Sequence, residues 1–199
     1  MSRTIKFMLN KQLDAIIKEE KNTIANLSNA SALLFDQLSN INWAGFYLWD
    51  SEDDELILGP FQGKVACIRI KHGEGVCGTA FKEQRSLIVD DVHLFPGHIT
   101  CDAESQSEIV VPITKNGKQI GILDIDAPIK NRFSEEDRSI ARRICSCFIT
   151  VYKYLNALYT CQSQFIDYTL FSICALKPSS ELNNHQKKAG TVSQPFLQI

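Results

Sequence analysis

The sequence lacks a strong charge of one sign and a long hydrophobic run. Its 21 Lys and Arg residues are nearly balanced by 23 Asp and Glu residues, so charge gives no reason to expect a nucleic acid or an anionic membrane as partner. No run reaches the roughly 18 apolar residues of a membrane span, and the first twenty residues become charged before a signal-peptide core develops. We therefore expect a cytoplasmic protein that binds neither nucleic acid nor membranes.

The sequence also lacks the cysteine pairs that are typical of zinc sites. Among its seven cysteines, no two are spaced as Cys-x2-Cys. His93, His98 and Cys101 are residue types that bind zinc, as are Cys67 and Cys77, but the spacings of these five residues match no usual zinc pattern. We expect no bound metal and no other bound cofactor. In a reducing compartment, thiols without a metal are core residues or redox groups.

The apolar pattern predicts helices at both ends of a domain and strands between them. Helical spacing of apolar residues marks two helices before residue 40 and another from Ser134 to about residue 158. A short helix is expected after the glycine-rich segment 73–78. Alternating or short apolar runs predict strands at Trp43–Trp49, Glu55–Leu58, Val65–Ile70, Leu87–Val89, Glu108–Thr114 and Gln119–Asp126.

These elements predict an α+β fold over residues 1–158. Consecutive strands without long crossovers favour an antiparallel sheet of about six strands, flanked by helices. The last two strands are joined across Asn116-Gly117, a strong signal for a hairpin. Residues 159–199 end in a polar stretch without periodicity, and we expect them to form a poorly ordered extension.

Three cysteines lie in the glycine-rich middle of the chain. Cys101 falls within a long polar loop, Cys67 on a predicted strand, and Cys77 among glycines just before a predicted helix. Amide dipoles at a helix N-terminus favour a thiolate, so we expect a lowered pKa for the Cys77 thiol. Two interpretations stay open for each residue, a small buried apolar side chain or a reactive thiol.

Carboxylates and aromatic residues share faces of the predicted strands. Asp124 and Asp126 point to one face, and Glu108 opens the preceding strand of the same hairpin. Three such acids repel one another unless a cation or a shared proton offsets them, or unless they form a solvated face. Trp43 and Tyr47 share one face of another strand, where core packing is the alternative. Together they suggest a pocket for a small zwitterion, with thiols that can be oxidised at its rim.

Six motifs, taken in order, resemble the GAF-domain free methionine-(R)-sulfoxide reductases. They are NWAGFYL at 42–48, GPFQGK at 59–64, GVCG at 75–78, FPGHI at 95–99, SEIVVP at 107–112 and DID at 124–126. The resemblance spans residues 12 to 155. It implies a GAF fold and thiol-dependent reduction of free L-methionine (R)-S-oxide to methionine.

The resemblance also implies roles for the three thiols. Cys101 matches the catalytic cysteine, which attacks the sulfoxide and is left as a sulfenic acid. Cys67 or Cys77 then condenses with it to a disulfide, which thioredoxin reduces. Some descriptions of the family give the attacking role to the residue at Cys77, so both assignments stay open.

The acids and aromatic residues acquire roles by the same resemblance. Glu108, Asp124 and Asp126 match the substrate carboxylates, and Trp43 and Tyr47 match the wall that holds the methyl-sulfinyl group. The family often forms homodimers. A different class of function also fits a GAF fold, namely a non-catalytic module that binds a small ligand and regulates a partner.

Overall fold

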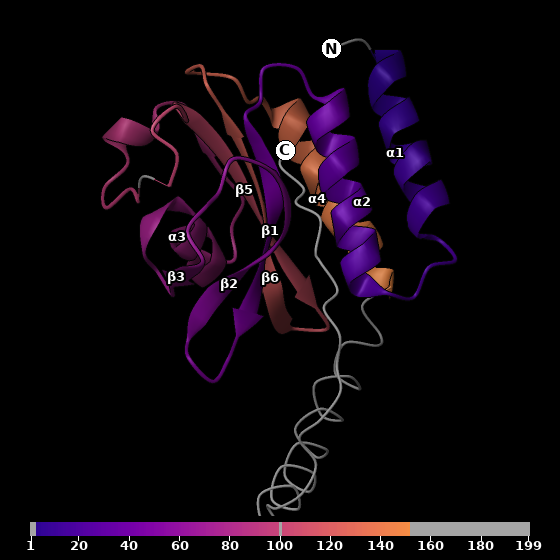
Figure 1. The fold of residues 1–199 in the computed structure, drawn as a ribbon, viewed down its shortest axis with the longest axis horizontal. Helices are drawn as coiled ribbons and strands as arrows, with labels where there is room; N and C mark the ends of the chain where they lie inside the picture. The colour runs from indigo at the N-terminus through magenta and orange to yellow at the C-terminus, as the bar shows by residue number, and fades with distance from the viewer. Residues whose placement is uncertain (1–2, 100, 152–199) are drawn as a thin grey trace, which may run out of the picture. The chain divides into compact units, whose positions relative to one another are not determined.

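The computed structural model describes residues 3–99 and 101–151 (Figure 1). In chain order, the elements are α1 (Arg3–Ile17), α2 (Thr23–Gln37), β1 (Trp43–Asp50), β2 (Glu55–Gly63), β3 (Arg69–Lys71), α3 (Gly75–Glu83), β4 (Leu87–Val89), the 3-10 helix η1 (Val92–Leu94), β5 (Ser107–Lys115), β6 (Lys118–Ala127) and α4 (Glu135–Val151). None of the described helices is long and apolar enough to span a membrane. The predicted extension at 159–199 lies outside the described residues.

The strands form one sheet in the order β3-β2-β1-β6-β5-β4, with every neighbouring pair antiparallel. The predicted α+β fold with a six-stranded antiparallel sheet is therefore confirmed. The β5–β6 turn forms where it was expected, with positive φ angles at Asn116 (50°) and Gly117 (76°). Asn and Gly tolerate this left-handed conformation, which tight hairpin turns require.

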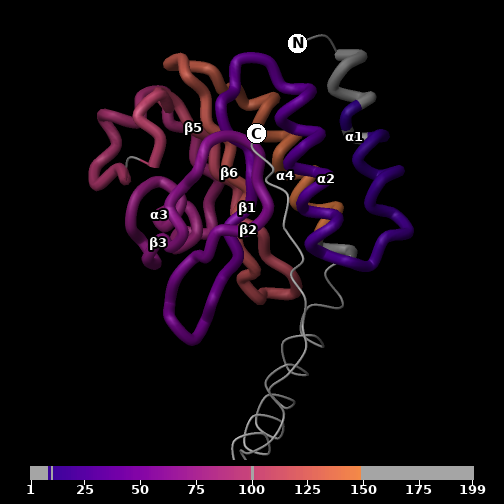
Figure 2. The backbone as a smooth tube through the Cα atoms, in the orientation of Figure 1, coloured from indigo at the N-terminus to yellow at the C-terminus, as the bar shows by residue number. Residues whose placement is uncertain are grey.

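Each face of the sheet packs against different helices. Ala44 and Phe46 of β1 face a core that is completed by α1, α2 and α4, whereas Trp43 and Tyr47 face a second core that is covered by α3. Figure 1 shows α2 and α4 on one side of the sheet and α3 on the other. The chain between β4 and β5 projects on the α3 side as well (Figure 2). The candidate site residues lie on this second face.

The prediction of a strand at Val65–Ile70 is wrong for most of this segment. Only Arg69–Lys71 pairs with β2, and Val65 and Ile68 are 87% and 69% exposed instead of alternating between two faces. Hydrogen bonds from distant side chains hold the segment between β2 and β3. Trp43 Nε1–H donates to the Lys64 carbonyl, and the Tyr47 hydroxyl donates to the Cys67 carbonyl. Periodicity cannot reveal such contacts, because they depend on the tertiary fold.

Candidate active site

A pocket of about 40 Å³ lies on the α3 side of the sheet. It is bounded by β1, β5 and β6, by the first turn of α3, and by residues on either side of the pocket mouth, namely Val65, Ala66, Ile99 and Cys101. Seven of the eight predicted site residues line it, namely Trp43, Tyr47, Cys77, Cys101, Glu108, Asp124 and Asp126. The eighth, Cys67, is covalently bonded to one of the seven. The fold therefore gathers the whole predicted set around one cavity.

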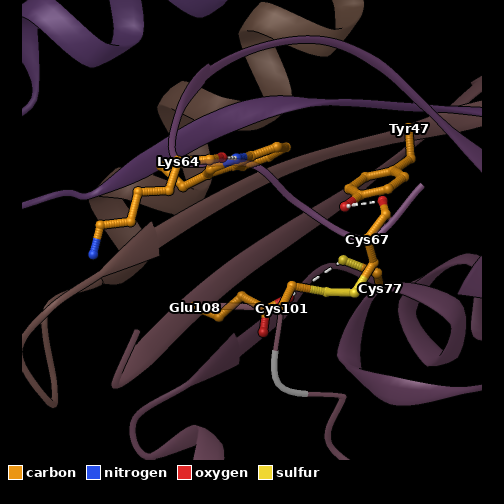
Figure 3. Close-up of a disulfide and its surroundings, with 7 residues drawn as sticks. Tyr47, Lys64, Cys67, Cys77, Cys101 and Glu108 are labelled. Atoms are coloured by element: carbon orange, nitrogen blue, oxygen red, sulfur yellow. Dashed lines mark hydrogen bonds between the residues drawn. A yellow bond between two sulfur atoms is a disulfide. The ribbon is translucent and has the colours of Figure 1, made fainter. Parts of the chain in front are cut away.

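Cys67 and Cys101 form a disulfide, with their Cα atoms 5.5 Å apart (Figure 3). The bond joins two irregular segments, one between β2 and β3 and the other between β4 and β5. Cys101 is exposed and Cys67 is half-buried, so solvent reaches the bond from the Cys101 side. An exposed disulfide at a pocket rim is accessible to an external thiol.

Cys77 is a free thiol at the base of the pocket. It lies in the first turn of α3, is 6% exposed, and its Sγ donates to Glu108 Oε1 at 3.3 Å. The expected lowering of its pKa is wrong: burial, reinforced by the charges of Asp124 and Glu108, raises the pKa of the Cys77 thiol well above its usual value. Desolvation and nearby negative charge outweigh the helix dipole here. The Cys77 thiol is therefore protonated at neutral pH.

The three acids converge because β5 and β6 are paired in register. Glu108 lies opposite Asp126, and Val110 opposite Asp124, so the acidic side chains share one face. Glu108 and Asp124 are each only 5% exposed, which excludes the solvated-face interpretation for them, while Asp126 is half-buried.

This burial changes the protonation of the acids. Burial and the neighbouring Asp126 raise the pKa of Glu108 to about 8. Burial is the largest cause that raises the pKa values of Asp124 and Asp126 well above the usual range, and the adjacent carboxylates raise them further. Asp124 Oδ1 is buried and has no hydrogen-bond partner. Glu108 therefore keeps its proton at neutral pH and can donate it, while burial disfavours the ionised forms of Asp124 and Asp126.

Trp43 and Tyr47 form an aromatic wall on the same side. Their rings stack with centroids 5.9 Å apart, and Trp43 also stacks on Phe61 at 5.3 Å. The hydrogen bonds of both rings to the carbonyls of Lys64 and Cys67 are 3.1 Å long. Hence the wall also positions the segment that carries Cys67 (Figure 3).

Several polar residues connect the two segments that carry the disulfide, and the sequence did not predict these contacts. Lys64 Nζ lies 2.7 Å from Glu104 Oε2 and 3.8 Å from Asp102 Oδ1, which links the two segments that carry the disulfide. The Asn42 side-chain amide donates to Asp102 Oδ2 and to Ser105 Oγ, at 3.0 Å each. The only sequence signal was the place of Asn42 and Lys64 within the quoted motifs, because these contacts join residues far apart in the chain.

The histidines do not assemble the zinc site that was considered on paper. The His93 and His98 rings lie near each other, 6.2 Å between centroids, but the sulfur atoms of Cys67 and Cys101 are consumed in the disulfide. Among the described residues, the side chains that bring metal-binding atoms together are instead Cys77, Glu108 and Asp124.

The chain is similar in sequence to known proteins with a GAF domain. The family described as GAF domain matches residues 25–146. A curated Escherichia coli (strain K12) protein named free methionine-R-sulfoxide reductase is 51% identical over 136 residues, which cover 68% of this chain and 81% of that protein.

Two solved structures are similar in both fold and sequence. One is free methionine-R-sulfoxide reductase from Neisseria meningitidis in complex with its substrate, with 36% identity and a TM-score of 0.74, covering 77% of this chain and 92% of the other. The second is the reduced form of fRMsr of Staphylococcus aureus, with 53% identity and a TM-score of 0.70, covering 73% and 94%. All the pocket residues described above fall within the segment matched by the GAF domain family.

Proposed function

Because this chain belongs to the GAF-domain family of free methionine-(R)-sulfoxide reductases, we propose that it reduces free L-methionine (R)-S-oxide to L-methionine. One observation carries the proposal: a disulfide between Cys67 and Cys101 lies at the rim of a pocket whose floor holds buried carboxyl groups. Reduction of a sulfoxide needs both parts, a thiol to accept oxygen and an acid to protonate that oxygen.

The pocket provides complementary groups for the two ends of the substrate. The positive charge of the substrate ammonium favours the ionised form of a carboxyl group in the acidic cluster, which then holds it, and the aromatic faces of Trp43 and Tyr47 pack against the methyl-sulfinyl end. A methionine sulfoxide residue within a peptide has no free ammonium to place against the acids. We therefore propose that the enzyme acts on the free amino acid.

The first chemical step transfers oxygen from substrate to enzyme. Cys101, as thiolate, attacks the sulfoxide sulfur while a protonated carboxyl group, for which Glu108 is suited by its pKa of about 8, donates to the sulfoxide oxygen. The oxygen ends on the Cys101 sulfur as a sulfenic acid, and methionine leaves as the thioether. The substrate gains the two electrons that the cysteine loses.

The second step forms the disulfide and the third reduces it. The Cys67 thiol condenses with the sulfenic acid of Cys101, forming the S–S bond and releasing water. The Cys67–Cys101 disulfide supports Cys67, rather than Cys77, as the resolving residue. The Cα atoms of Cys67 and Cys101 are 5.5 Å apart, a distance typical of disulfide-bonded cysteines. A dithiol such as thioredoxin then reduces the bond by thiol–disulfide exchange and is itself oxidised to a disulfide.

Methionine release by the purified chain tests this function. The substrate is free methionine-(R)-sulfoxide, with the (S) epimer and a peptide-bound sulfoxide as controls, and the reductant is dithiothreitol or thioredoxin with its reductase. We expect turnover of the free (R) epimer alone. No turnover of either epimer by the folded, reduced chain would refute the proposal and favour a ligand-binding GAF module.

A further inference from the structure

Three metal-binding side chains from three different elements meet at the base of the pocket. Cys77 comes from α3, Glu108 from β5 and Asp124 from β6, and each places a potential ligand atom within 4.8 Å of the others. All three side chains are buried. Figure 3 shows the Cys77 sulfur directed at the Glu108 carboxyl group.

The spacing of these atoms fits a tetrahedral zinc ion. Zinc binds sulfur at about 2.3 Å and carboxylate oxygen at about 2.1 Å, so a tetrahedral site separates the two ligands by about 3.6 Å. Cys77 Sγ and Glu108 Oε1 are 3.3 Å apart. An ion between them therefore requires a displacement of only a few tenths of an ångström.

An independent observation indicates that the cluster lacks a partner. Asp124 Oδ1 is buried in the pocket wall without a hydrogen bond, although the residue is only 5% exposed. A buried polar atom left without a partner costs about 1–3 kcal/mol. A cation bound between the three side chains would coordinate this oxygen.

The donor set identifies the class of cation. Hard cations such as Mg²⁺ and Ca²⁺ prefer oxygen ligands alone, whereas a thiolate favours a softer ion. We propose that Cys77, Glu108 and Asp124 bind one Zn²⁺ ion, whose fourth position faces the pocket, and that the Cys77 thiol and the protonated carboxyl groups release their protons to solvent as the ion binds. Zinc at this position occupies the carboxylates that would hold methionine sulfoxide, so it inhibits the enzyme competitively, a consequence that rests on the proposed function.

Metal binding by the full chain tests the site without reference to activity. The Cys67–Cys101 disulfide is kept intact, which removes those two thiols as ligands and avoids reductants that chelate metal. We expect Zn²⁺ to bind in preference to Mg²⁺. Co²⁺, used as a spectroscopic substitute, should show a thiolate-to-metal charge-transfer band.

Matched variants locate the ion. Cys77→Ala should lose the charge-transfer band and weaken Zn²⁺ binding by at least about tenfold, whereas Cys145→Ala, which removes another buried free thiol, should change neither. Asp124→Asn keeps all thiols and should also weaken Zn²⁺ binding, which guards against misfolding of a single variant. Equal affinity of the unmodified chain and both site variants would overturn the proposal.

Inhibition kinetics separate this proposal from the proposed function. In the reductase assay, run with thioredoxin and its reductase instead of the chelating dithiothreitol and with the free Zn²⁺ concentration buffered, we expect Zn²⁺ to raise the apparent KM for methionine-(R)-sulfoxide without changing kcat. Inhibition that lowers kcat alone would overturn the location of the ion. Turnover without Zn²⁺ binding refutes only the metal site, whereas Zn²⁺ binding without turnover refutes only the reductase function.

Discussion

Replacing Glu108 by Gln should make the stability of the protein less dependent on pH. The Glu108 carboxyl group keeps its proton up to about pH 8 in the folded state, because burial and Asp126 disfavour its ionised form. In the unfolded chain the same group ionises near 4.5. Between these two values the folded state therefore binds more protons, so its free energy of unfolding falls as pH rises.

The size of the effect follows from the two pKa values. One pKa unit corresponds to about 1.4 kcal/mol, so for Glu108 alone the free energy of unfolding should fall by about 3 kcal/mol between pH 6 and pH 9. Gln does not titrate, and its amide oxygen can still accept the hydrogen bond from Cys77. The variant should therefore lose this part of the pH dependence and keep the part due to Asp124 and Asp126.

Urea unfolding of the disulfide-bonded protein at both pH values measures this difference. The control is Glu83→Gln, which removes an exposed carboxylate that pairs with Arg85 on the surface. We expect Glu83→Gln to show the same fall in stability as the unmodified chain, and Glu108→Gln a fall that is smaller by about 3 kcal/mol. An equal fall in all three proteins would refute the assignment of a protonated Glu108.

The thiols, the aromatic wall and the strand packing give three further predictions. Cys101→Ser should abolish turnover, whereas Cys67→Ser should release about one methionine per chain and then fail to recycle with thioredoxin. Quantification of released methionine measures both effects, and full turnover by Cys101→Ser would contradict the mechanism. Tyr47→Phe removes the hydrogen bond to the Cys67 carbonyl and should lower the free energy of unfolding by about 1 kcal/mol in urea; an unchanged value would refute its role in holding this segment. Gly121→Ala should lower the free energy of unfolding by about 1–3 kcal/mol, because its Cβ would collide with the Tyr47 carbonyl; an unchanged melting temperature would contradict that packing.

Local patterns in the sequence predicted most of the fold. The period of two in residues 43–48 assigned Trp43 and Tyr47 to one face and Phe46 to the other, and the structure buries them in separate cores. The turn at Asn116-Gly117 formed as expected because two adjacent residues determine its conformation. Such features depend on near neighbours in the chain, which a single sequence displays directly.

Features that depend on distant residues could not be predicted in the same way. The family resemblance left both Cys67 and Cys77 as possible partners of Cys101, whereas the structure joins Cys67 to Cys101 across 34 residues of sequence. The pKa of the Cys77 thiol was expected to fall from its place on a helix, because the sequence did not show that the side chain is buried beside Glu108. Burial and long-range contact therefore account for what the sequence alone could not assign.

The different surroundings of Cys77 and Cys101 favour Cys101 as the attacking thiol. The nucleophile must form a thiolate, yet burial and three neighbouring carboxyl groups raise the pKa of Cys77 well above its usual value. Cys101 is exposed at the rim, where water can solvate a thiolate and an external dithiol can later reach the disulfide. The same acidic surroundings that suppress the Cys77 thiolate keep Glu108 protonated for the sulfoxide oxygen. In the proposed mechanism, one cluster of acids therefore supplies the proton and leaves Cys101 as the thiol that can form a thiolate.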